Sequence, residues 1–127
     1  MESFVDGAYR TFTEETPGQL TGKEGYALEL SANANVQLWT NGKQIGWMHT
    51  KLQGSNDVVV RLCGKGGTVK VVAGGAVALK DNVKPANGGK MVVAATGNRS
   101  TGIKISPAAA SADGDLMEIL DVVETAP

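Results

Sequence analysis

The feature that most constrains the fold is the density of glycine between residues 64 and 102, where nine glycines separate short runs of valine and alanine. Glycine readily takes the backbone angles of tight turns, and inside a helix it costs about 1 kcal/mol relative to alanine. The runs between the glycines are too short for helices, and their β-branched side chains favour strands. This pattern predicts an all-β fold, a small β-barrel or sandwich of short antiparallel strands.

Length and composition indicate one globular domain. The chain has 127 residues, of which 42% are hydrophobic and 20% charged, and a domain of this size buries roughly two thirds of its unfolded surface. Cys63 is the only cysteine, so no internal disulfide is possible. The first ten residues lack the basic and apolar parts of a signal peptide, and no segment has the ~18 apolar residues of a membrane span. We therefore expect no membrane partner.

Charge is distributed unevenly along the chain. Residues 1–30 carry a net charge of −4, residues 43–104 of +8 and residues 105–127 of −5. Acidic ends around a basic middle predict charge matching, either within the fold or between neighbouring copies. A basic, strand-rich protein could bind nucleic acid, but residues 58–104 contain no aromatic ring on which a base could stack. Nucleic acid is therefore the less favoured partner.

The dipeptide Asn-Gly at residues 41–42 predicts a β-hairpin. It lies between two runs of alternating apolar residues, which is typical of a type I′ turn and pairs residues 36–40 with residues 43–47. Trp39 and Gln44 then lie on the outward face, where Trp39 is a candidate surface contact. The inward face of this predicted hairpin holds Val36, Leu38, Ile45 and Trp47.

A second hairpin is predicted around GKGG at residues 64–67, which would join residues 57–63 to residues 68–74. In this register Arg61 and Lys70 lie opposite one another on the outer face, and both are candidate surface contacts. Like charges in such a pair are mildly unfavourable. The pairing therefore requires an acidic partner nearby, or the register is different.

The second half of the chain predicts further short strands at residues 76–80, 91–95, 103–105 and 115–123. In the last of these, Leu116, Glu118 and Leu120 alternate with Met117, Ile119 and Asp121 on the two faces of the expected strand. The intervening residues 106–114 contain a serine followed by proline and end in glycine, which predicts one helical turn.

Residues 1–20 are expected to form an extended N-terminal arm, and residues 21–127 a single β domain. The arm is polar and contains a Pro-Gly dipeptide, yet it holds three of the six aromatic residues. A loose segment with anchoring rings is typical of a partner-binding arm, and solvated charge is expected for its glutamates at 14 and 15. The partner-binding residues predicted for the arm are Phe4, Tyr9 and Phe12.

The sequence contains no constellation of catalytic residues. His49 is the only histidine and has no neighbouring cysteine or pair of carboxylates, whereas metal sites and general bases need clustered ligands or positioned partners. Cys63 ends an apolar run and is expected to be a small buried hydrophobic residue. We therefore predict a protein that is not an enzyme, with no catalytic, cofactor-binding or metal-binding residues and no cofactor.

The order of features in the second half resembles a known family. The segment GGAVALKDNVKPANGGKMVVAATGNRSTGIKI is followed by the alanine-rich spacer SPAAASADGD and by LMEILDV. Over residues 71–123 this order resembles the small decoration, or cement, proteins of tailed-phage capsids. The matching residues are Gly74, Gly75, Val77, Gly88, Gly89, Gly102, Ile103, Gly114, Asp115, Leu116, Ile119 and Leu120.

The resemblance implies a non-enzymatic structural protein of a bacteriophage virion. Such proteins are made in the host cytoplasm, bind the major capsid protein on the outer capsid surface as homo-oligomers, often trimers, and stabilise the shell. Two alternatives remain open on the residues alone. One is a small β-barrel that binds nucleic acid through the basic middle, and the other is a carbohydrate-binding module that uses outward Trp39 with Gln37 and Gln44.

Overall fold

A computed structural model describes residues 7–127, so the predicted contact at Phe4 lies outside the described residues. Those residues form strands, turns and loops with no helix, and every pair of named strands is antiparallel. The prediction of an all-β fold of short antiparallel strands is confirmed. The strands are β1 (Tyr9–Thr13), β2 (Ala27–Leu30), β3 (Val36–Leu38), β4 (Gln44–Lys51), β5 (Asp57–Leu62), β6 (Thr68–Val72), β7 (Asn82–Pro85), β8 (Met91–Val93), β9 (Arg99–Ser100), β10 (Gly102–Ser106), β11 (Leu116–Leu120) and β12 (Glu124–Thr125).

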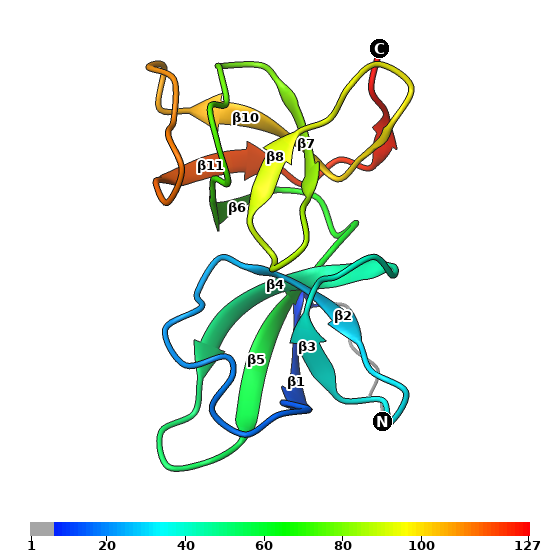
Figure 1. Cartoon of the computed structure of the whole chain (residues 1–127), viewed down its shortest axis with the longest axis vertical. Coiled ribbons are helices and arrows are strands. Elements are labelled where there is room, and N and C mark those ends of the chain that lie inside the picture. The colour runs from blue at the N-terminus through cyan, green and yellow to red at the C-terminus, as the bar shows by residue number, and fades with distance from the viewer. Residues whose placement is uncertain (1–6) are drawn as a thin grey trace.

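The two halves of the chain build one sheet each (Figure 1). The first sheet has the order β1-β5-β4-β2-β3, and the second has the order β6-β11-β10-β7-β8. A small third sheet pairs β12 with β9 beside the second. Figure 1 shows the first and second sheets at opposite ends of the long axis. The sheets stay open at their edges, so the arrangement is sandwich-like and not a closed barrel.

Two apolar clusters hold these sheets together. One lies within the first half and contains Leu28, Met48 and Val60. The other is built mainly from the second half, but it also takes in Ala27 and Trp47 of the first sheet, both with no exposed surface. A buried tryptophan removes about 150–250 Å² from solvent. Trp47 is therefore a principal apolar link between the two halves.

The Asn-Gly hairpin predicted at residues 41–42 is wrong. Strands β3 and β4 do not pair with each other, because β2 lies between them and pairs with both. The carboxylate of Glu29 on β2 accepts hydrogen bonds from the backbone N–H groups of Thr40 and Gly42, each at 3.0 Å. The loop that was expected to close a two-strand hairpin instead wraps around this buried carboxylate.

The hairpin predicted around residues 64–67 is also wrong. Strand β5 pairs with β1 and β4 in the first sheet, whereas β6 pairs with β11 in the second. The loop 64–67 is thus the crossing point between the sheets. Residues 106–114 form no helical turn, and residues 76–80 contain a single bridge at Val77 in place of a strand.

Part of the segment that was expected to be an arm belongs to the first sheet, as strand β1 (Tyr9–Thr13). All five residues of β1 pair with β5, and Leu20 has no exposed surface. Glu14 is buried and not solvated: its carboxylate accepts the Gly18 and Leu20 N–H groups at 2.8 and 3.2 Å and lies 2.6 Å from the Lys51 Nζ. Burial opposes ionisation of Glu14, but these hydrogen bonds and the lysine outweigh it and lower its pKa.

Candidate binding surfaces between the two sheets

Two grooves lie between the first and second sheets, and they share no lining residue. The first, which we call the Tyr9 groove, has a volume of about 410 Å³. The Tyr9 side chain is 49% exposed, and its ring centroid lies 4.8 Å from that of His49. Leu116 is 61% exposed, the highest value among the exposed large hydrophobic residues of the described chain. The groove therefore combines two exposed apolar side chains from different sheets.

Lys70 also lines the Tyr9 groove, where it is directly opposite Glu118 in the pairing of β6 with β11. An opposite charge at this cross-strand position is mildly stabilising. The sequence named Tyr9 and Lys70 separately, and the fold brings them to one surface. Phe12 lies on the other face of β1, where it packs against the first core beneath the Arg10 guanidinium, which is 4.6 Å from the ring centroid.

Arg61 lies inside the protein and not on the outer face predicted for it. Only 5% of the residue is exposed, and its Nη1 is 2.9 Å from the Asp121 Oδ2. Asp121 also accepts the backbone N–H groups of Gly64 and Lys65 at 2.9 and 2.8 Å. This network joins β5, the crossing loop and the residue after β11. The predicted register opposite Lys70 does not occur, and the acidic partner of Arg61 is Asp121.

The second groove, the Trp39 groove, has a volume of about 580 Å³. It lies between the loop before β4 and the strands β7 and β9. Three cationic side chains line it, and none forms an ion pair with a carboxylate of residues 7–127. Trp39 is half-buried, in contrast to the outward position predicted for it. The lining residues are Trp39, Gly42, Lys43, Gln44, Cys63, Lys84, Pro85, Asn98, Arg99, Thr101 and Val123.

Hydrogen bonds fix the shape of the Trp39 groove. The Trp39 indole N–H donates to the Gly42 carbonyl at 2.9 Å, and the Thr101 hydroxyl donates to the Gln44 side-chain oxygen at 2.8 Å across the two sheets. Behind the loop, Glu29 accepts four hydrogen bonds, from Thr40 twice and once each from Gln37 and Gly42. Although burial raises the pKa of Glu29, these donors lower it to about 2.

Sequence reasoning found Trp39 and Gln44 but missed the cations that accompany them. Lys43 lies next to the Asn-Gly signal, yet Lys84 and Arg99 come from segments more than 40 residues further along the chain. No local pattern connects these positions. They meet because β7 of the second sheet and β9 of the third sheet lie beside the loop that precedes β4 in the first sheet.

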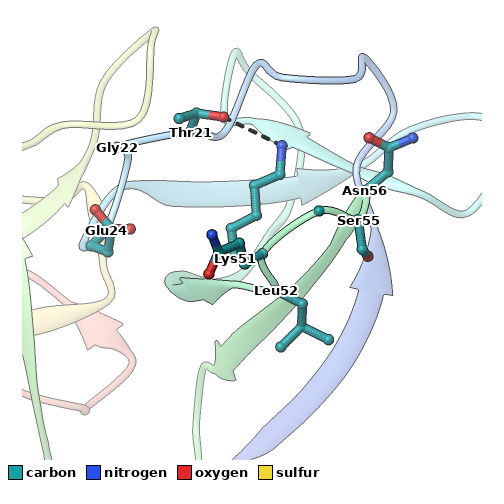
Figure 2. Close-up of a pocket in the computed structure, with 9 residues that line it drawn as sticks. Thr21, Gly22, Glu24, Lys51, Leu52, Ser55 and Asn56 are labelled. Atoms are coloured by element: carbon teal, nitrogen blue, oxygen red, sulfur yellow. Dashed lines mark hydrogen bonds between the residues drawn. The ribbon is translucent and has the colours of Figure 1, made fainter.

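A third hollow is shallower and lies beside the loop that follows β4 (Figure 2). Figure 2 shows Lys51 extending toward Thr21, to whose hydroxyl it donates at 3.3 Å. Because the same ammonium group is engaged by Glu14, Lys51 fastens the segment before β2 to the end of β4. We assign this hollow a structural role.

The residues with reactive side chains are separated in space. The His49 ring lies against the Tyr9 ring at an interplanar angle of 56°, whereas Cys63 lines the other groove. Burial, with a further contribution from the charge of Asp121, raises the pKa of the Cys63 thiol to about 12. Within residues 7–127 no group of three His, Cys, Asp or Glu side chains is placed to hold a metal ion. The described chain also has no helix that is long and apolar enough to span a membrane.

Comparison with known proteins defines the class of fold. No protein-family model matches the sequence, and no curated protein sequence matches it either. Among solved structures, the fold is similar to a base domain of a phage head fibre. That structure is the N base of the head fibre gp8.5 of bacteriophage phi29, with a TM-score of 0.55 over 90% of this chain and 94% of that one. The two sequences are 12% identical, so the likeness concerns the fold.

Proposed function

We propose that this chain is a non-enzymatic structural protein of a tailed-phage virion, which binds the outside of the major capsid shell. The observation that carries the proposal is the fold likeness to a head fibre base over 90% of the chain. The resemblance of residues 71–123 to capsid decoration proteins supports it independently, because that resemblance rests on sequence order and the likeness rests on backbone geometry.

The distribution of charge supports this proposal over nucleic-acid binding. Of the bases that make the middle of the chain positive, Arg61 and Lys104 are buried. The Lys104 ammonium group donates to the carbonyl oxygens of Val77 and Ala109, at 3.1 and 2.7 Å. Neither residue is available to neutralise a phosphate, which is the main source of affinity for nucleic acid.

The Tyr9 groove is the proposed contact with the shell. Tyr9 and Leu116 present apolar surface there, and burial of one such side chain contributes on the order of 1.5–3 kcal/mol. Among the described residues, the residues of β1 pair with β5 alone, and Glu14 directly after them bridges to Val36; the other edge of β1, at Tyr9–Thr13, is where we propose that a strand of a partner pairs. A rigid sheet edge beside apolar side chains suits a protein that must bind tightly to a capsid in one fixed orientation.

Co-sedimentation with capsids assembled from the major capsid protein of the same genome tests the proposal. We expect the wild-type chain to pellet with capsids, and Tyr9→Ser combined with Leu116→Ser to lose at least tenfold in affinity. Leu79→Ser is the matched control, because Leu79 is also an exposed large hydrophobic residue but lies outside the groove. Absence of wild-type binding at micromolar concentration would refute the function, whereas equal binding by all variants would refute the surface.

The same proposal includes self-association, with a trimer favoured. A monomer has a mass of 13.1 kDa, so light scattering coupled to size exclusion separates the states clearly. We expect the wild type to be a trimer. If the Tyr9 groove also joins the copies, the double variant Tyr9→Ser, Leu116→Ser should have the mass of a monomer. A wild-type monomer at all concentrations would exclude self-association in solution.

A further inference from the structure

We propose that the Trp39 groove binds an anionic glycan, a sugar chain whose units carry carboxylate or phosphate groups. This is a second function, on a surface that shares no residue with the proposed contact to the capsid.

The first argument for an anionic ligand is the positive charge of the side chains that line the Trp39 groove. Lys43, Lys84 and Arg99 converge on one hollow, and the described residues that line it include no acidic side chain. The nearest buried carboxylates are already satisfied: Glu29 by the loop behind the groove, and Asp121 by Arg61 and the crossing loop. Three cations that have no carboxylate partner among residues 7–127 and lie in a partly enclosed site attract a negative ligand more strongly than scattered surface lysines do.

The second argument is the aromatic ring. Trp39 lines the groove and also packs against the apolar cluster that contains Trp47. Its indole N–H donates a hydrogen bond to the Gly42 carbonyl. The ring is therefore fixed, and its exposed part offers an apolar surface with a negative π face. The C–H groups on one face of a pyranose stack on such a ring, and cations at its edge then meet the acidic substituents of the sugar.

The third argument is preorganisation. The loop that carries Trp39 and Lys43 is held from behind by three hydrogen bonds to the buried Glu29 carboxylate, and Gln37 in β3 donates a fourth. A connection between strands does not need a buried charge at its centre, and burying one is costly unless it is fully hydrogen-bonded. A loop already ordered in its bound shape loses little entropy on binding.

The lining favours sugar over two other anionic ligands. Proteins that bind single-stranded nucleic acid stack successive bases on several rings, and this groove has one. An acidic peptide would add a strand to a free sheet edge or fill apolar pockets, whereas the groove presents amide and hydroxyl groups at Gln44, Asn98 and Thr101. Amides and hydroxyls suit the dense hydroxyl groups of a sugar chain.

Titration of the full chain with two acidic sugars, tetragalacturonic acid and glucose 6-phosphate, tests the site by NMR. We expect at least one of them to bind with a Kd of about 0.1–1 mM at low salt. Its affinity should exceed that of neutral maltotetraose at least tenfold and should fall at high salt. The indole N–H signal of half-buried Trp39 should shift, whereas that of buried Trp47 should stay in place.

Charge removal from the groove is the matching mutational test. The triple variant Lys43→Gln, Lys84→Gln, Arg99→Gln should lose at least tenfold in affinity. None of the three side chains is buried, so the fold should survive, as the amide spectrum would verify.

The control triple variant carries the same change of charge at lysines that lie outside both grooves and are not buried, and it should bind the sugar like the wild type: Lys23→Gln, Lys65→Gln and Lys80→Gln. Failure of both acidic sugars to bind would overturn the proposal. Equal binding of maltotetraose, of hexaglutamate or of an oligothymidylate would also overturn it, because the groove would then not select an acidic sugar. Capsid binding is measured separately, so either function can fail without the other.

Discussion

Replacement of Glu29 by glutamine tests the electrostatic account of the loop at residues 39–43. The folded protein holds the pKa of Glu29 at about 2, against 4.5 for an unperturbed carboxyl. Since each pKa unit is about 1.36 kcal/mol, the depression corresponds to about 3 kcal/mol of stability at neutral pH. The four donors around the carboxylate are the source of this stabilisation.

The pH dependence of the stability difference between the wild type and Glu29→Gln identifies the charge of Glu29 as its source. A carboxyl whose pKa is lowered by folding stabilises the folded state above its unfolded pKa of 4.5, and this contribution is lost as the pH falls toward 2. Glutamine keeps an oxygen for the Thr40 and Gly42 N–H groups but has no charge to lose. We therefore expect Glu29→Gln to be less stable by about 2–3 kcal/mol at pH 7, with the difference shrinking below pH 4.5.

Urea unfolding between pH 7 and pH 3, followed by tryptophan fluorescence, measures this difference. Hydrogen bonds also lower the pKa values of Glu14 and Glu15, and the Lys51 ammonium group contributes to the lowering at Glu14. These groups are common to both proteins, so the comparison isolates Glu29. Glu24→Gln, at an exposed position with no side-chain hydrogen bond in the described chain, is the control. A stability difference that stays constant from pH 7 to pH 3 would refute the reasoning.

Three further predictions concern the core and the buried groups. Asp121→Ala should cost about 3–5 kcal/mol in urea unfolding, because it leaves Arg61 buried without a partner; a loss below about 1 kcal/mol would contradict this. Gly46→Ala should lower the melting temperature sharply, since its Cβ would collide with the Arg61 carbonyl, whereas Gly75→Ala enters open space and should be neutral. Cys63 should react with a disulfide reagent at pH 8 much more slowly in the folded protein than in urea, since burial raises its thiol pKa; equal rates would show an accessible thiolate.

The strands of the second half show what local sequence can predict. In β11, Leu116, Glu118 and Leu120 alternate with Met117 and Ile119, and the structure buries the second set. The period of a strand is local, so it can be recognised without knowing the partner strand. The density of glycine likewise predicted an all-β chain, because its turn preference acts at the residue itself.

Strand pairing and the candidate sites could not be predicted in the same way. The Asn-Gly signal at residues 41–42 favours a two-residue turn, but the gain from such a turn is small beside four hydrogen bonds to Glu29. Glu29 lies between 8 and 13 residues before these donors, and its burial depends on the whole first sheet. Arg61 and Asp121 are 60 residues apart, so only the three-dimensional fold shows that they pair.

The buried carboxylates explain how a chain with so few reactive side chains can shape binding surfaces. Each one gathers the backbone N–H groups of a loop that contains glycine. Glu14 accepts the N–H of Gly18, Glu29 that of Gly42, and Asp121 that of Gly64. Tight turns leave such donors without a strand partner, and a buried donor must be satisfied. Part of the acidic charge at the two ends of the chain is therefore used inside the fold, to fix loops. The basic side chains at the Trp39 groove form no ion pair with a carboxylate of residues 7–127, and they are the groups we propose for a ligand.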